Sequence, residues 1–293
     1  MRTRIIQLLT VFFLTTWLTV PVSADFDADD TAAYSNQYYT SSSHAGDAGG
    51  TGDIREPLGD ISVGGLRSED PVKGYSSCMK AAKHGDVQSL FNLGYMHYHG
   101  FGIEVDKARA AMWFKKAAVR GHLEAQKSLG FMYAKGDGVP QDYAEAMKWF
   151  RMSAASGDAQ SQFTIGSMYF NGWGVEMDKK EAARWCRKAA DQGDPQAQFI
   201  LGSMYVKGEG VPLDYSEAAR LFQQSAEQGN SDGEFSLALL YYNGWGVRQD
   251  REEALKWCLI AAEKGNEQAK LVLNSMIKHK MVHQPHEGKV AAK

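Results

Sequence analysis

A period of 36 residues runs through most of the chain and constrains its fold more than any other feature. A glycine that follows leucine or isoleucine recurs at Gly94, Gly130, Gly166 and Gly202, and Ala238 takes the fifth place. A Gly-x-Gly pair, an aspartate and a closing glycine recur with the same step. Five units in one register predict an array of equal structural units.

Each unit is predicted to contain two helices joined by a turn. In the second unit Ala125, Leu129 and Met132 fall on one helical face, and the Gly-x-Gly pair ends that helix. Asp142 and Glu145 predict a capping box that opens the second helix. The same pair recurs at Asp178/Glu181, Asp214/Glu217 and Asp250/Glu253. One hairpin cannot bury its own apolar face, so the units are expected to stack into an all-α solenoid.

The predicted solenoid covers residues 72–281 and has half-repeats at both ends. Its five repeats are 86–121, 122–157, 158–193, 194–229 and 230–265, with caps at 72–85 and 266–281. Residues 282–293 are predicted to be a flexible tail.

The first 24 residues have the pattern of a signal peptide. Arg2 and Arg4 precede an apolar stretch from Ile5 to Val20, and Val22-Ser23-Ala24 places small residues at a cleavage site. The apolar stretch is shorter than the roughly 20 residues of a permanent membrane anchor. The sequence therefore predicts export to the periplasm or the exterior, with no membrane span after cleavage.

Residues 25–71 form a segment of different composition. They contain ten acidic residues, only Arg55 and Arg67 as bases, and many serines and glycines. Too little apolar surface is present to offset the entropy of ordering, so a disordered acidic linker is predicted. The repeats mix both signs of charge in a chain of net charge −3, which predicts no binding of nucleic acid.

The repeat resembles the Sel1-like repeat, a relative of the tetratricopeptide repeat. The shared pattern is Ala-Gln-x-x-Leu-Gly-x-Met-Tyr-x-x-Gly-x-Gly-Val-x-x-Asp-x-x-Glu-Ala-x-x-Trp-Phe-x-x-Ala-Ala-x-x-Gly, and residues 122–229 follow it most closely. Arg109, Leu221 and Ala238 depart from it. The resemblance implies a right-handed α-solenoid that holds protein partners together in secretion, envelope, cell-surface or host-interaction pathways.

The three cysteines share one repeat position, the one that Phe114, Phe150 and Phe222 hold in other units. Cys186 and Cys258 are two repeats apart, roughly 20 Å if helices stack at 8–10 Å. A disulfide needs Cα atoms within about 7 Å, so these cysteines and Cys78 are predicted to be core thiols. This argues against the cysteine-rich branch of the family, to which a β-lactamase activity has been ascribed.

Signatures of catalysis and metal binding are missing from the sequence. It contains no His-Glu-x-x-His, no Gly-x-Ser-x-Gly and no Gly-Lys-Ser/Thr phosphate loop. His97 and His99 are about 200° apart on a helix, and His279 and His283 are expected to be solvated. We therefore expect no catalytic residue, no metal site and no cofactor.

Two rows of aromatic residues are the candidate binding sites for a protein or peptide partner. The first row, on one side of the first helices, comprises Phe91, Tyr95, Tyr98, Phe131, Phe170 and Tyr242. The second lies in the turns of alternate repeats and comprises Phe101, Trp173 and Trp245. The alternatives are that the first row packs against neighbouring helices and that each tryptophan folds over its own hairpin.

These features predict an exported interaction scaffold that is not an enzyme, from a Gram-negative bacterium. A structural part of an envelope machine such as a flagellar motor is an alternative, as is a hydrolase of the cysteine-rich branch. An adaptor of the endoplasmic reticulum is disfavoured because the chain has no Asn-x-Ser/Thr site.

Cleavage of the signal peptide gives the first testable prediction. When the full chain is expressed in a Gram-negative host, we expect the protein in the envelope fraction to begin at Asp25, because signal peptidase cleaves after small residues such as Ala24. Mass spectrometry of the intact protein measures this. A protein that keeps Met1 and stays in the membrane would instead indicate an uncleaved anchor.

Overall fold

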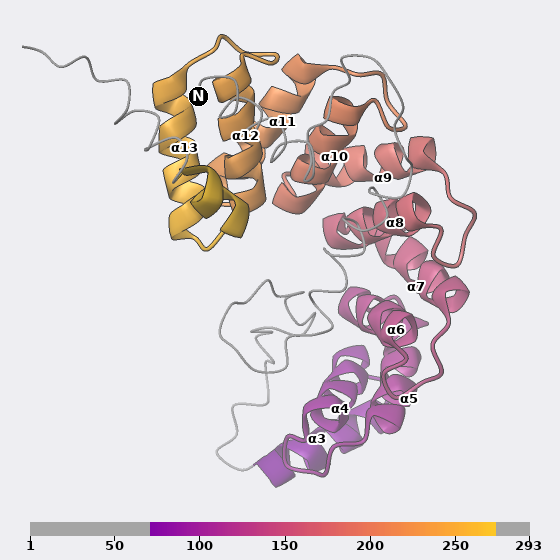
Figure 1. The fold of residues 1–293 in the computed structure, drawn as a ribbon. Helices are drawn as coiled ribbons and strands as arrows, with labels where there is room; N and C mark the ends of the chain where they lie inside the picture. The colour runs from indigo at the N-terminus through magenta and orange to yellow at the C-terminus, as the bar shows by residue number, and fades with distance from the viewer. Residues whose placement is uncertain (1–70, 274–293) are drawn as a thin grey trace, which may run out of the picture. The chain divides into compact units, whose positions relative to one another are not determined.

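The computed structural model describes residues 71–273, which are helical throughout apart from turns and contain no strand (Figure 1). The predicted signal peptide, the acidic linker up to residue 70, the part of the C-terminal cap from residue 274 and the tail at 282–293 lie outside the described residues. Among those described, no helix has the length and apolar character to cross a bilayer.

Eleven helices are described, and all but the first pair into five hairpins. The first is α3 (Pro71–Lys83). The hairpins are α4 (Val87–His99) with α5 (Lys107–Ala118), α6 (Leu123–Lys135) with α7 (Tyr143–Ala155), α8 (Ala159–Asn171) with α9 (Lys179–Asp191), α10 (Pro195–Lys207) with α11 (Tyr215–Glu227), and α12 (Ser231–Asn243) with α13 (Arg251–Glu263). Each second helix also packs against the first helix of the next hairpin, and helical backbone resumes over 267–273. The predicted all-α solenoid of five repeats is confirmed.

The caps of the helices follow from the recurring glycines and aspartates. Gly136 ends α6 in the left-handed region with φ 72°, which is favourable for glycine because it lacks a Cβ atom. Asp142 begins α7, and its side chain accepts a hydrogen bond from the Glu145 amide.

The predicted capping box is only half formed. The Asp142 amide donates to the Tyr133 carbonyl of the preceding helix at 2.9 Å, so it is already satisfied. The Glu145 side chain pairs with Lys148 instead. The same backbone bond ties Asp178, Asp214 and Asp250 to the first helix of their own hairpins, and the turn is thereby closed onto that helix.

The recurring Leu-Gly glycine lets the two helices of a hairpin approach closely. A Cβ atom at Gly130 would lie 2.6 Å from the Phe150 ring, and one at Gly94 2.5 Å from the Phe114 ring. In the fifth repeat the large ring is replaced by the smaller Cys258, and Ala238 then takes the glycine's place. Alanine is accommodated beside Cys258, whereas the third repeat keeps Gly166 beside Cys186, where a Cβ atom would lie 2.7 Å from the thiol sulfur.

All three cysteines are buried free thiols, as the repeat spacing predicts. Burial raises the pKa of Cys186 to about 12 and that of Cys258 to about 11. These thiols therefore remain protonated at neutral pH and serve as core packing.

In repeats two to five, the second glycine of the Gly-x-Gly turn makes the close contact with the preceding repeat. Gly174 has φ 67°, and a Cβ atom there would lie 2.5 Å from the Tyr143 carbonyl carbon at the start of α7. The equivalent glycines meet the start of the preceding second helix in the same way: Gly138 at Lys107, Gly210 at Lys179 and Gly246 at Tyr215. We call each contact between a turn and the start of the preceding second helix a joint between repeats.

We expect Gly174→Ala to destabilise the protein more than Gly193→Ala. Both glycines have positive φ, which costs alanine about 1–2 kcal/mol, but a Cβ atom at Gly193 meets nothing within 4 Å. At Gly174 the clash with the backbone of the previous repeat adds about 1–3 kcal/mol. Chemical denaturation of both variants measures the difference, and equal free energies of unfolding would contradict the proposed joint.

Candidate functional site

Phe91 is completely buried, so its assignment to a partner-binding surface was wrong. Its ring stacks on His122, the residue that caps the next repeat, with 4.4 Å between centroids, and lies 5.5 Å from Phe114. Phe91 fills the space between repeats because the first helix is flanked on both sides by neighbouring helices.

Four aromatic rings gather on the first repeat, next to Phe91. Tyr95 stacks on Phe101 with 5.5 Å between centroids and 3° between planes, and His99 lies 4.4 Å from Tyr95 and 5.0 Å from Tyr98. Phe101 has 47% of its surface exposed, and the other three rings are partly exposed. We call Tyr95, Tyr98, His99 and Phe101 the aromatic cluster.

The chain folds this way here because Tyr95, Tyr98 and His99 lie within one turn of α4, and Gly100 then turns the backbone so that Phe101 folds back onto Tyr95. Three of the four rings were predicted from the sequence as binding residues, but Phe101 was placed in a separate row from Tyr95 and Tyr98. His99 was assessed only as a metal ligand and was missed as a ring of this cluster.

One side of the aromatic cluster is anchored to the second repeat. The Tyr98 hydroxyl donates to Asp137 at 2.7 Å, and Lys107 bonds to Asp137 at 2.9 Å while lying 5.1 Å from the centre of the Tyr98 ring. Partial burial raises the pKa of Asp137, but the hydrogen bonds from Lys107 and Tyr98 outweigh burial and leave that pKa below its usual value. Asp137 is therefore a fixed negative charge at the rim.

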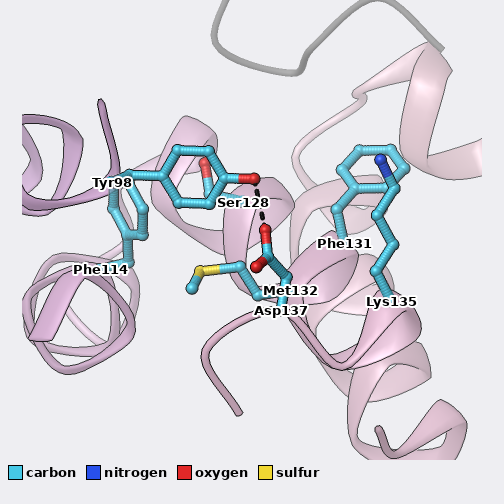
Figure 2. A pocket seen from close by; sticks show the side chains of 7 residues that line it. All are labelled: Tyr98, Phe114, Ser128, Phe131, Met132, Lys135 and Asp137. Atoms are coloured by element: carbon cyan, nitrogen blue, oxygen red, sulfur yellow. Dashed lines mark hydrogen bonds between the residues drawn. The ribbon is translucent and has the colours of Figure 1, made fainter. Parts of the chain in front are cut away.

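A small pocket adjoins the aromatic cluster between the first two repeats, and Figure 2 shows it with Tyr98 bonded to Asp137. Ser128, Phe131, Met132 and Lys135 line it from α6, and Phe114 lines it from α5. The Phe131 ring meets Phe150 edge-on at 4.9 Å and is partly exposed. Phe131 thus belongs to the same surface as Tyr98, as its row predicts.

The remaining residues of the first row lie in other repeats. Phe170 is partly exposed on the third repeat, with the Lys179 ammonium 5.5 Å from its ring centre, and Lys179 pairs with Glu209 of the fourth repeat. Tyr242 is partly exposed on the fifth repeat. The structure therefore does not gather Phe170 and Tyr242 with Tyr98 into one site.

The tryptophans of the second row are part of the joints between repeats. Trp173 stacks on Tyr143 of the second repeat at 5.9 Å, and Trp245 stacks on Tyr215 of the fourth at 5.6 Å. Each tryptophan packs on the preceding repeat, so neither the row of free anchors nor folding over its own hairpin describes it. Both are half-buried for this reason.

The two-repeat alternation of the sequence has the same explanation. Joints between repeats two and three and between four and five are aromatic stacks. The other two joints are ion pairs, Lys107–Asp137 and Lys179–Glu209, each at 2.9 Å. The turn residue of one repeat and the first residue of the preceding second helix change together, because they touch.

Comparison with known families decides what these repeats are. The profile of the Sel1 repeat matches five consecutive stretches, residues 87–122, 123–158, 159–194, 195–230 and 231–266. The chain belongs to the Sel1 repeat family. Proteins of this family typically act as scaffolds for protein–protein interaction and are generally not enzymes.

Solved structures of Sel1 repeat proteins resemble this chain. A protective antigen present in uropathogenic Escherichia coli strains is 34% identical with a TM-score of 0.69, and the match covers 83% of this chain but 47% of the antigen. The chain thus spans about half of that protein's length. A Sel1 repeat protein from Oxalobacter formigenes is 30% identical with a TM-score of 0.66, covering 75% and 87% of the two chains. Comparison with curated proteins gives no match.

The second Sel1 repeat contains a buried charge that the sequence analysis missed. Lys127 stands where other repeats carry Phe91 or Phe199, and its ammonium pairs with Glu124 at 2.9 Å and with Asp158 of the third repeat at 3.2 Å. Burial lowers the pKa of Lys127, but these two carboxylates outweigh burial and raise it. The lysine at a position that is aromatic in the other repeats was the sequence signal that could have revealed this charge. Its ion pair with Asp158 joins repeats two and three.

The histidines of the Sel1 array have separate roles. His97 is buried and meets Tyr75 of α3 edge-on at 5.7 Å, whereas His99 belongs to the aromatic cluster. Within residues 71–273, no three side chains of His, Cys, Asp or Glu come together as metal ligands would. His279 and His283 lie outside that part of the chain.

The stack on Trp173 predicts a loss of stability when the ring is removed. We expect Trp173→Ala to cost about 2 kcal/mol, less than a fully buried ring. A double-mutant cycle with Tyr143→Ala should give a coupling energy of about 0.5–1.5 kcal/mol. Phe101→Ala is the control, because Phe101 stacks within its own repeat and should cost about 1 kcal/mol or less. Unchanged stability of the Trp173 variant would restore the view of Trp173 as a free anchor.

Proposed function

We propose that the chain is an exported, non-enzymatic Sel1 scaffold that binds a peptide segment of a protein partner on the aromatic cluster. The observation that carries this proposal is the gathering of four partly exposed rings, Tyr95, Tyr98, His99 and Phe101, beside a pocket. Partly exposed aromatic side chains held by their neighbours are typical anchors of interfaces.

The fold does not require this arrangement. The first repeat is the only one of the five with rings at all three positions of Tyr95, His99 and Phe101. The third repeat has Ser167 and Asn171 at the first two, and the fourth has Glu209 at the third. Because other repeats stack with small or polar residues at these places, the three rings are available for a role other than stacking.

The surroundings indicate the chemistry of the bound segment. The stacked rings favour a large apolar or aromatic side chain that lies across them. The adjoining pocket, lined by Phe131 and Met132, has a volume of about 10 Å³, which is room for about one water molecule. Lys135 and Asp137 at the rim provide one donor of hydrogen bonds and one acceptor to orient the backbone of an extended peptide.

Export is supported by the predicted signal peptide, from the basic Arg2 and Arg4 to the cleavage site at Ala24. It places the scaffold in the periplasm or outside the cell. The alternative role, a structural part of an envelope machine, is compatible with the same binding surface. The two roles differ only in the partner that is bound.

The test replaces the rings by residues that other repeats already use. The variant Tyr95→Ser, His99→Asn, Phe101→Glu keeps the fold compatible with the array, and Leu213→Gln removes an exposed apolar side chain elsewhere as the control. Partners captured from a native envelope extract are identified by mass spectrometry, and their affinity is measured by calorimetry.

We expect the triple variant to bind the captured partner at least about ten-fold more weakly, because truncation of aromatic anchors removes about 2 kcal/mol or more. The control should bind as the unchanged protein does. Equal affinity of the triple variant, with an unchanged melting temperature, would show that recognition lies on another surface.

A further inference from the structure

The outer side of α5 differs from that of all the other second helices. Helices α7, α9, α11 and α13 each carry a glutamate that pairs with a lysine or arginine three residues later. These pairs are Lys148–Glu145 at 2.6 Å, Arg184–Glu181 at 3.0 Å, Arg220–Glu217 at 2.8 Å and Lys256–Glu253 at 3.2 Å. In α5 the two positions hold Arg109 and Met112, so the ion pair is replaced by a cation and an apolar side chain.

Two large apolar side chains are exposed on this helix. Met112 has 60% of its surface exposed and Val119 61%. Val119 caps α5 and keeps helical backbone angles, so these side chains, seven residues apart, lie on one face about 10 Å from each other. The third, fourth and fifth repeats carry Asp191, Glu227 and Glu263 at the position of Val119.

The charged residues of α5 and the two residues after it are all basic. The stretch from Lys107 to Arg120 contains no acidic residue. Its basic residues are Lys107, Arg109, Lys115, Lys116 and Arg120. Arg109 contacts the capping Asp106 at 3.1 Å and Lys116 lies 4.0 Å from the centre of the Trp113 ring, so parts of this face are held in place. In a chain of net charge −3, this is a local concentration of positive charge.

We propose that the outer face of α5 is a docking surface for an acidic amphipathic helix of a partner protein. Two apolar side chains of that helix, about two turns apart, would cover Met112 and Val119, and its carboxylates would face Arg109, Lys115 and Arg120. Charge complementarity selects an acidic partner over a neutral or basic one. The surface lies on a different helix from the aromatic cluster, so it stands or falls independently of the proposed function.

Stacking of the array does not account for these residues. The other four repeats form the same hairpin with a glutamate and a cation at the positions of Arg109 and Met112. An exposed methionine adapts its shape to an apolar partner, and the cations around it keep the free surface hydrated.

The test measures binding of defined peptides to the full chain by fluorescence anisotropy. The probe is a labelled peptide rich in glutamate with two leucines seven residues apart, so that as a helix it presents both on one face. A second peptide has glutamine in place of every glutamate. The variant Arg109→Glu, Met112→Lys, Val119→Glu installs on α5 the pattern of α11 and α13, and Met112→Gln alone removes the apolar anchor without changing charge.

The control variant is Lys180→Glu, which makes the same change in net charge on the exposed part of α9. We expect the acidic peptide to bind the unchanged chain and the control alike, at least about ten-fold more tightly than the triple variant. The glutamine peptide should bind at least ten-fold more weakly, and Met112→Gln should weaken binding by a smaller factor. Binding should also weaken as salt is added.

Three results would overturn the proposal. If the triple variant bound the acidic peptide with unchanged affinity, the binding surface would lie elsewhere. If Lys180→Glu lost as much affinity as the triple variant, the net charge of the molecule would explain the binding. Equal affinity for the glutamate and glutamine peptides would show that the surface does not select an acidic partner. Melting temperatures of all variants, measured by circular dichroism, separate a lost surface from a lost fold.

Discussion

The stack depends on one close approach, that of the second turn glycine in repeats two to five to the start of the preceding second helix. At Gly174 the distance leaves no room for a Cβ atom, and the positive φ angle favours glycine on its own account. The turn residue next to this glycine is therefore brought against the first residue of the preceding second helix. The joints share this backbone contact and differ only in their side chains, which form an aromatic stack in two joints and an ion pair in the other two.

A similar coupling acts within single repeats, between the first helix of a hairpin and the residue that caps the end of its second helix. Gln192 donates to Gln162 at 2.7 Å and Gln228 donates to Gln198 at 2.8 Å, thirty residues apart in each case. In the last repeat the pair becomes Lys264 and the buried Glu234, which form an ion pair. Two glutamines and a lysine–glutamate pair fill equivalent places because each provides one donor and one acceptor.

The first repeat departs from the others at several exposed or partly exposed positions. On α4 and the following turn it gathers four rings, and on α5 it replaces an ion pair by Arg109 and Met112. In a repeat array each unit contacts only its neighbours, so surface residues that serve no joint are free to vary without loss of the fold. Apart from Tyr98 and Lys107, which both bond to Asp137 of the second repeat, the residues of both proposed surfaces are of this kind. Both surfaces lie on the one repeat that is preceded by a single helix, α3.

The sequence by itself determined the array: its period, the two helices of each unit, their caps and the burial of the cysteines. These follow from local rules, since periodicity, glycine φ angles and aspartate caps act within a few residues or one repeat. The aromatic residues could be picked out in the same way, but their roles could not. Phe91 and Trp173 touch residues about thirty positions away, and a single sequence does not show which side of a helix a neighbour covers. Only the tertiary structure decided that Phe91 is core, that Trp173 packs between repeats and that Phe101 joins Tyr95, because burial depends on what the neighbouring elements place against each ring.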